Sequence, residues 1–136
     1  MAGADLLEGA DAVIPVPLHP IRSIRRGFNQ ADDLACQLDR PVWRALRRRR
    51  HGPPQASLPA GRRHANLTSA FAISAAWALA APLRGQSLDG RIIVLVDDVM
   101  TTGETIDACS RVLLEAGVNE VRALTAARTT GARAFR

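Results

Sequence analysis

One stretch of the chain, residues 92–106, constrains the fold more than any other. It starts with a continuous run of aliphatic residues at 92–96, which is typical of a strand buried on both faces of a parallel sheet. Two aspartates, Asp97 and Asp98, and a short loop follow, and the spacing then predicts a helix over residues 102–116. In open α/β sheets, ligands bind outside the carboxyl ends of the strands. The stretch therefore predicts a ligand site at the end of this strand.

The loop after the two aspartates suits a phosphate group. Its backbone N–H groups and the amino end of the following helix attract an anion. Thr101, Thr102 and Thr105 add hydroxyl donors, and Gly103 lets the backbone approach a phosphate closely. The aspartates would repel a phosphate, but they suit the hydroxyl groups of a sugar beside it. A plain strand–turn–helix is the alternative, and it would need only one capping aspartate. A Walker-type loop is excluded, because the chain contains neither GxxxxGK[ST] nor any lysine.

The rest of the chain alternates strand-like and helix-like segments. Further strands are expected at residues 12–16, 42–46, 70–73 and 120–126. Phe28, Ala31, Leu34, Ala35 and Leu38 lie on one face of a predicted helix that Pro41 ends. We expect residues 47–66 to form a long polar loop, and residues 74–90 carry no clear signal. The predicted fold is α/β, an open and mainly parallel sheet flanked by helices, in a single domain over residues 1–136.

Charge and cysteine content narrow the ligand class. The formal net charge is +5, and the 18 positively charged residues are all arginines. Arginine suits phosphate recognition. The lack of lysine is also what genome composition alone would give. Residues 47–50 are four consecutive arginines, which form either a solvated face or a contact with nucleic acid or pyrophosphate. We expect Cys36 and Cys109 to be reduced and mostly buried, rather than joined in a disulfide or bound to zinc. Trp77 is expected to be either a packing residue or a surface anchor.

The run VLVDDVMTTGET at residues 94–105 resembles the ribose-phosphate signature of type I phosphoribosyltransferases. The resemblance implies that Asp97 and Asp98 hold the 2′- and 3′-hydroxyls of phosphoribosyl pyrophosphate. It implies that the loop around the 5′-phosphate consists of Val99, Met100, Thr101, Thr102, Gly103, Glu104 and Thr105. Mg²⁺ is the implied cofactor and binds with the pyrophosphate, with no direct protein ligand unless the two aspartates supply one.

Other segments resemble the ComF family of competence proteins. They are VIPVPLHP at residues 13–20, RGFNQ at 26–30, LTAAR at 124–128, and the spaced set Gln55, Leu58, Arg63, Asn66, Ala70 and Phe71. The resemblance implies pyrophosphate contacts from Leu18, His19, Arg22 and Arg26, and a flexible loop containing Arg62, Arg63 and Asn66. Family members commonly carry an N-terminal zinc ribbon with CxxC pairs. None occurs in this sequence, so we expect a domain shortened at its N-terminus.

Two functions follow from these patterns. The first is phosphoribosyl transfer to a nitrogenous base that the sequence does not identify. The second is a non-catalytic accessory role in DNA uptake, with single-stranded DNA and the uptake machinery as partners. No apolar run is long enough for a membrane span and no secretory leader is evident, so we expect a cytoplasmic protein without membrane insertion. A homodimer is compatible with either function.

Overall fold

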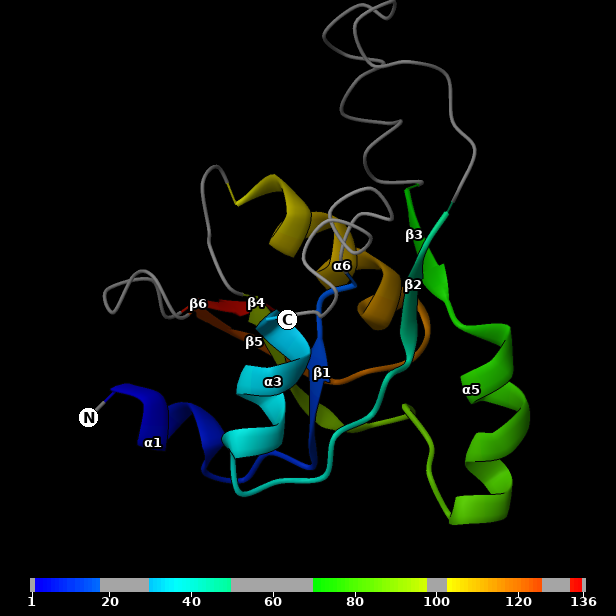
Figure 1. The fold of residues 1–136 in the computed structure, drawn as a ribbon, viewed down its shortest axis with the longest axis horizontal. Coiled ribbons are helices and arrows are strands. Elements are labelled where there is room, and N and C mark those ends of the chain that lie inside the picture. The colour runs from blue at the N-terminus through cyan, green and yellow to red at the C-terminus, as the bar shows by residue number, and fades with distance from the viewer. Residues whose placement is uncertain (1, 18–29, 50–69, 98–102, 126–132, 136) are drawn as a thin grey trace, which may run out of the picture.

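The computed structural model describes residues 2–17, 30–49, 70–97, 103–125 and 133–135. Within these ranges, four strands form the main sheet in the order β1-β4-β5-β6 (Figure 1). Strands β1 (Ala12–Pro15), β4 (Ile92–Asp97) and β5 (Glu120–Thr125) are parallel. Strand β6 (Arg133–Phe135) runs antiparallel to β5 at the edge. The predicted open, mainly parallel α/β sheet is confirmed.

Strand β4 is central because it pairs with a parallel neighbour on each side. Ile14 of β1 is in register with Leu95, which is in register with Ala123 of β5. Four consecutive residues of β4 are fully buried: Ile93, Val94, Leu95 and Val96. Burial on both faces explains why the strand is a continuous aliphatic run rather than an alternating one. The strand predicted at residues 92–96 is confirmed, and the structure extends it to Asp97.

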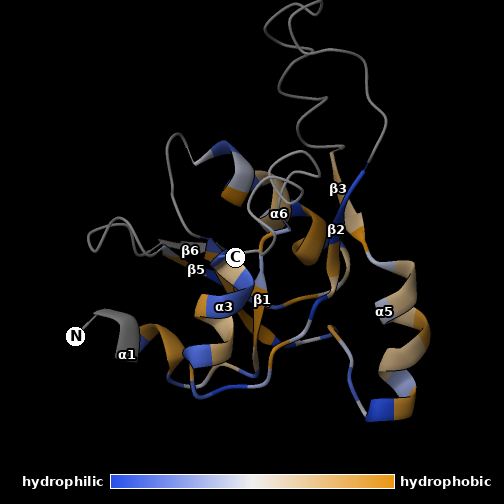
Figure 2. Ribbon diagram, viewed as in Figure 1, coloured by the Kyte–Doolittle hydropathy of each residue, from blue (hydrophilic) through white to orange (hydrophobic). Residues whose placement is uncertain are grey.

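Helices cover both faces of this sheet, and the side chains of β4 alternate between them. Ile93 and Leu95 belong to the core under helix α6 (Glu104–Glu115). Val94 and Val96 belong to a second core that includes Ala35 of helix α3 (Gln30–Gln37). Helix α1 (Ala2–Leu7), which the sequence patterns did not predict, contacts β5. In Figure 2 most of β1 is coloured as hydrophobic.

A separate antiparallel pair, β2 (Leu46–Arg48) and β3 (Phe71–Ile73), packs against α6. Phe71 is almost fully buried there. The strand predicted at 70–73 is thereby confirmed, apart from its first residue. The strand predicted at 42–46 is wrong, because Val42 makes only an isolated bridge to Val13. Two hydrogen bonds form this bridge: the Val13 N–H group donates to the Pro41 carbonyl, and the Trp43 N–H group donates to the Val13 carbonyl. The chain then turns away and becomes a strand only from Leu46, where β3 supplies a partner.

Residues 74–90 form more regular structure than their sequence indicated. Helix α5 (Ala75–Ala80) starts at Ser74, whose side chain accepts a hydrogen bond from the Trp77 N–H group, and the 3₁₀ helix η2 (Ala81–Arg84) follows. Trp77 packs against the core, with its ring centroid 5.8 Å from that of Trp43. Leu79 and Leu83 are exposed, so these turns carry a weak apolar pattern. The packing role expected for Trp77 is confirmed.

Three smaller expectations need correction. Cys109 is buried as predicted, but Cys36 is exposed on α3, because it lies on the side of that helix turned away from the buried Ala31 and Ala35. The helix predicted over residues 102–116 is α6, which is shorter at both ends, and Ala116 is its exposed C-cap residue. Arg47 was expected in a loop and instead lies in β2. No helix in the described parts of the chain is long and apolar enough to cross a bilayer.

Candidate functional site

The described ends of β1 and β4 lie side by side at the carboxyl edge of the sheet. The Val16 N–H group donates a 2.8 Å hydrogen bond to the carbonyl oxygen of Val96. On the other side of β4, Asp97 is in register with Thr125, the last residue of β5. The carboxyl ends of three parallel strands therefore meet at one edge, with Asp97 on the central strand.

The path of the chain reverses between β1 and β4. After β1 the chain passes through α3 and reaches Val42, which bridges to β1 on the side away from β4. After β4 it passes through α6, on the opposite face, and reaches β5 on the side away from β1. The two connections leave in opposite directions, so the carboxyl ends of β1 and β4 form a topological switch point of the sheet. Open α/β sheets bind their ligands at switch points of this kind.

Helix α6 begins close behind the end of β4. Its N-cap is Gly103, whose φ of 82° and ψ of −6° are left-handed. Residues with a Cβ rarely adopt this conformation, so the position favours glycine. The Gly103 carbonyl accepts the first helical hydrogen bond, from Asp107 N at 2.9 Å, and no side chain caps the helix. The amino end of a 12-residue helix, with its partial positive charge, thus comes next along the chain after β4, with residues 98–103 between them.

The charges of Asp97 and of Arg48 on β2 both act on a buried thiol, that of Cys109 in the middle of α6. Burial raises the pKa of the Cys109 thiol on α6, the positive charge of Arg48 lowers it, and the negative charge of Asp97 raises it further. The guanidinium carbon of Arg48 lies 4.6 Å from the centroid of the Phe71 ring. Arg48 therefore differs from Arg47 and Arg49, which are exposed, because it is packed against Phe71.

The structure places four of the predicted site residues. Asp97 is half-buried at the end of β4, Gly103 is buried at the N-cap of α6, and Glu104 and Thr105 form the first turn of that helix. Asp97 ends β4, and Gly103, Glu104 and Thr105 lie at the start of α6, after residues 98–102. Their role in ligand binding stays a prediction. Thr125 was not predicted as a site residue, although its place at the end of a strand was a usable signal. The other candidates lie outside the described residues: Asp98, Val99, Met100, Thr101, Thr102, Leu18, His19, Arg22, Arg26, Arg62, Arg63 and Asn66.

Comparison with known proteins agrees with this architecture. Residues 24–134 match the family described as the phosphoribosyl transferase domain. The chain is 37% identical to Competence protein F of Haemophilus influenzae over 119 residues, which are 82% of this chain and 48% of that protein. It is 35% identical to the DNA utilization protein YhgH of Escherichia coli K12 over 128 residues, which are 90% of this chain and 52% of that protein.

A third relative is Competence protein ComFC of Bacillus subtilis, 34% identical over 105 residues, which are 77% of this chain and 39% of that protein. The chain spans about half the length of the curated relatives it matches, or less. Its match to the domain family, in contrast, covers most of its own residues. The parallel sheet, the strand–helix junction and these matches together show that the chain belongs to the phosphoribosyl transferase domain family, as a ComF-family protein.

Proposed function

We propose that the chain binds ribose 5-phosphate groups at the carboxyl edge of its sheet, with phosphoribosyl pyrophosphate as its substrate. In this proposal Asp97 and Asp98 accept hydrogen bonds from the ribose hydroxyls. Residues 99–105 surround the 5′-phosphate, which the amino end of α6 attracts. The reaction is phosphoribosyl transfer to a nitrogenous base, in which pyrophosphate leaves and positive charge develops on the ribose.

One observation carries the proposal: the left-handed Gly103 N-cap of α6 follows a buried parallel strand that ends at the switch point between β1 and β4. A glycine N-cap contributes no side chain of its own in front of the first N–H groups of α6. A phosphate could therefore come close to those groups. The half-buried carboxylate of Asp97 lies on the strand side of the same junction, where a sugar attached to that phosphate would extend.

The proposed Mg²⁺ binds mainly to the pyrophosphate and to water. Mg²⁺ is usually held by one or two carboxylates together with substrate phosphates and water, and a strand end carrying Asp97 suits this pattern. Leu18, His19, Arg22 and Arg26 are proposed to contact the pyrophosphate. Arg62, Arg63 and Asn66 are proposed to belong to a loop that closes over the reacting sugar and excludes water. A cytoplasmic location also stays a prediction of the sequence.

Calorimetry tests the binding proposal directly. Titration of the full chain with phosphoribosyl pyrophosphate and Mg²⁺ should give one site, and ribose 5-phosphate should compete for it. Release of pyrophosphate in the presence of a panel of purine and pyrimidine bases then tests for transfer. If neither phosphoribosyl pyrophosphate nor ribose 5-phosphate binds at concentrations up to about 1 mM, which corresponds to about 4 kcal/mol, the proposed function is wrong.

A second candidate function, binding of single-stranded DNA, has its own observation. Arg47 and Arg49 are exposed, and neither has an ion-pair partner among the described residues. Arg47 lies in β2, and Arg49 follows its end, where its N–H group donates a 2.6 Å hydrogen bond to the carbonyl oxygen of Ala70. Side chains two residues apart on an extended chain lie on the same side, so both can face one phosphate chain. The upper end of β2 is strongly hydrophilic in Figure 2. One relative bears the name DNA utilization protein, which supports DNA as the ligand in this second candidate.

The two candidates make different predictions about salt. DNA affinity should fall steeply with salt concentration, because arginines that neutralise phosphates release counterions. Binding of phosphoribosyl pyrophosphate should depend on Mg²⁺ and on the two aspartates. A fluorescence titration with labelled single-stranded DNA over a salt series separates them, and no measurable affinity at low salt would eliminate the DNA candidate.

A further inference from the structure

Asp97 lies on the same face of the sheet as the core under α6. Successive side chains of a strand alternate between its two faces, so Asp97 shares a face with Ile93 and Leu95. Those two residues belong to the core that also contains Cys109 of α6 and Phe71 of β3. The carboxylate of Asp97 is therefore placed at the edge of this core, where β4 ends.

Arg48 reaches the same core from the pair of strands β2 and β3. It is in register with Phe71, which is only 2% exposed, and its guanidinium carbon lies 4.6 Å from the centroid of the Phe71 ring. The Nε atom of Arg48 is buried. A positive charge is costly to place in a protein interior unless negative charge compensates for it. The packing of Arg48 therefore has an energetic reason only if it serves a carboxylate of the molecule.

The thiol of Cys109 indicates that the two charges lie in one region of the fold. This thiol is fully buried, and the positive charge of Arg48 lowers its pKa whereas the negative charge of Asp97 raises it. The effect of one charge on another group decreases with the distance between them, so both charges lie in the neighbourhood of the thiol. Arg48 and Asp97 are far apart in the sequence, and the packing of β2 and β3 against α6 brings them together.

We propose that Arg48 is a positioning residue for Asp97, and that its charge holds the carboxylate in the orientation that accepts hydrogen bonds from the ribose hydroxyls. This inference rests on the proposed function, in which Asp97 and Asp98 bind the ribose. Two adjacent carboxylates repel each other, and a cation fixed in the interior compensates for that repulsion. Arg48 is fixed by its stacking on Phe71, and it acts on the ligand only through the carboxylate.

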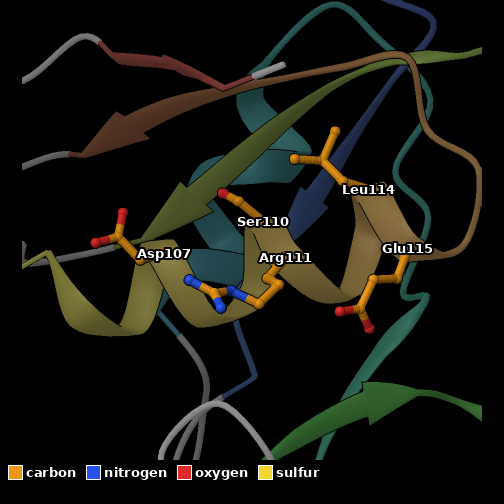
Figure 3. A pocket seen from close by; sticks show the side chains of 5 residues that line it. All are labelled: Asp107, Ser110, Arg111, Leu114 and Glu115. Carbon is orange, nitrogen blue, oxygen red and sulfur yellow. The ribbon is translucent and has the colours of Figure 1, made fainter. Parts of the chain in front are cut away.

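Arg111 provides a matched control on the helix that carries the thiol. It lies two residues beyond Cys109 but is exposed, on the flank of α6 that borders a hollow of about 370 Å³ together with Asp107 and Glu115 (Figure 3). Water and salt screen a charge at such a position much more than a charge in the interior. Replacing Arg111 therefore removes the same charge without affecting Asp97.

A double-mutant cycle tests whether Arg48 acts through Asp97. Arg48→Met removes the charge and keeps an apolar side chain over Phe71, and it should weaken ribose 5-phosphate binding about tenfold in calorimetry. In the Asp97→Asn background the same change should have no further effect, because the effects of two residues that interact do not multiply. Arg48→Lys retains the charge and should restore most of the affinity, and Arg111→Met should bind like the parent.

A second cycle needs no ligand, so it separates this inference from the proposed function. In chemical denaturation, the unfolding constants of the parent, Arg48→Met, Asp97→Asn and the double variant should show a coupling of at least about threefold. That coupling in a parent that does not bind ribose 5-phosphate would contradict the proposed function alone.

Independent effects of the two changes would overturn the inference. If the parent binds ribose 5-phosphate, the binding cycle decides, and losses of affinity that multiply would show that Arg48 does not act through Asp97. If the parent does not bind it, the unfolding cycle decides in the same way. Circular dichroism establishes that each variant is folded. If Arg48→Met does not fold, Arg48→Gln replaces it in both cycles.

Discussion

Gly103 connects the local backbone geometry to the proposed ligand. Its φ of 82° places it in the left-handed region at the start of α6. We predict that Gly103→Val reduces ribose 5-phosphate affinity by at least tenfold, because a branched side chain disfavours this backbone and occupies the space in front of the helix. The matched control is Gly85→Val, which puts the same side chain at a left-handed φ of 69° with nothing within 4 Å.

Both variants should be destabilised by roughly 1–2 kcal/mol in thermal unfolding, since each forces a side chain into a left-handed backbone. Calorimetry should find the affinity loss only in Gly103→Val. Equal affinity in the two variants would remove Gly103 from the phosphate site.

The acidic pair makes the second prediction. Asp97→Asn combined with Asp98→Asn should weaken phosphoribosyl pyrophosphate binding by about 3 kcal/mol, roughly a hundredfold, through the loss of two charge-assisted hydrogen bonds. Asp39→Asn, an exposed change in the loop after α3, is the control. Calorimetry on folded protein provides the measurement. A double variant with the parent's affinity would contradict the ribose assignment.

The two cysteines should differ sharply in reactivity. Cys36 is exposed, whereas Cys109 is buried and burial raises its pKa above the ordinary value of 9.0. The thiolate is the reactive form, so a thiol reagent at neutral pH should modify one cysteine of the native chain quickly and the second only on unfolding. Absorbance of a released chromophore counts the modified thiols. Rapid modification of both in native protein would show that α6 is not packed as described.

The raised pKa of Cys109 also predicts how the stability of the fold changes with pH. A thiol with a raised pKa in the folded state contributes fully below its ordinary pKa of 9.0, and the contribution is lost as the pH rises above that value. Alkaline unfolding should therefore be less steep in Cys109→Ala than in the parent, and denaturant titrations above pH 9 measure the difference. An identical pH slope would mean that Cys109 does not stay protonated in the native state.

At the scale of elements, the neighbouring arginines at strand β2 have two different roles. Arg48 packs over Phe71, whereas Arg47 and Arg49 point to solvent. We predict that Arg47→Ser with Arg49→Ser flattens the salt dependence of single-stranded DNA binding by about 1.4 slope units, or 0.7 per lost phosphate contact. Arg48→Ser should leave that slope unchanged and lower stability by about 1 kcal/mol through the lost cation–π contact.

A titration series over salt concentration, together with chemical denaturation, separates the two effects. Should the arginine pair leave the slope as it is, these side chains are simply solvated. If Arg48→Ser changes the slope and not the stability, the division of roles is wrong.

Sequence patterns predicted the elements whose own residues determine them. The aliphatic run of β4 and the spacing of Ile106, Cys109 and Leu113 in α6 each specify an element, because burial requires that pattern. Strand β2 could not be predicted this way, since an arginine-rich segment becomes a strand only by pairing with β3, which follows much later in the chain. Helix α5 was missed because an alanine-rich segment with exposed Leu79 has no clear polar and apolar faces.

At the scale of the whole molecule, the parallel order of β1, β4 and β5 followed from the alternation of strands and helices. The antiparallel edge strand β6 and the contact of α1 with β5 depend on long-range pairing that periodicity does not encode. The site, like the fold, could be predicted only where the local sequence determines it. The segment from Asp97 to Thr105 was evident from its local pattern, whereas the register of Thr125 with Asp97 and the packing of Arg48 over Phe71 required the fold.

The central claim is that a ribose 5-phosphate group binds at the junction of β4 and α6, and a backbone amide NMR titration tests it most directly. Adding ribose 5-phosphate without Mg²⁺ or a base should shift the amide signals of Gly103, Glu104 and Thr105 in a saturable way. The amides of Arg47 and Arg49 serve as the internal comparison, because they belong to the other exposed cationic surface. If their signals move while those of the junction stay still, the anion binds elsewhere and the proposed function is wrong.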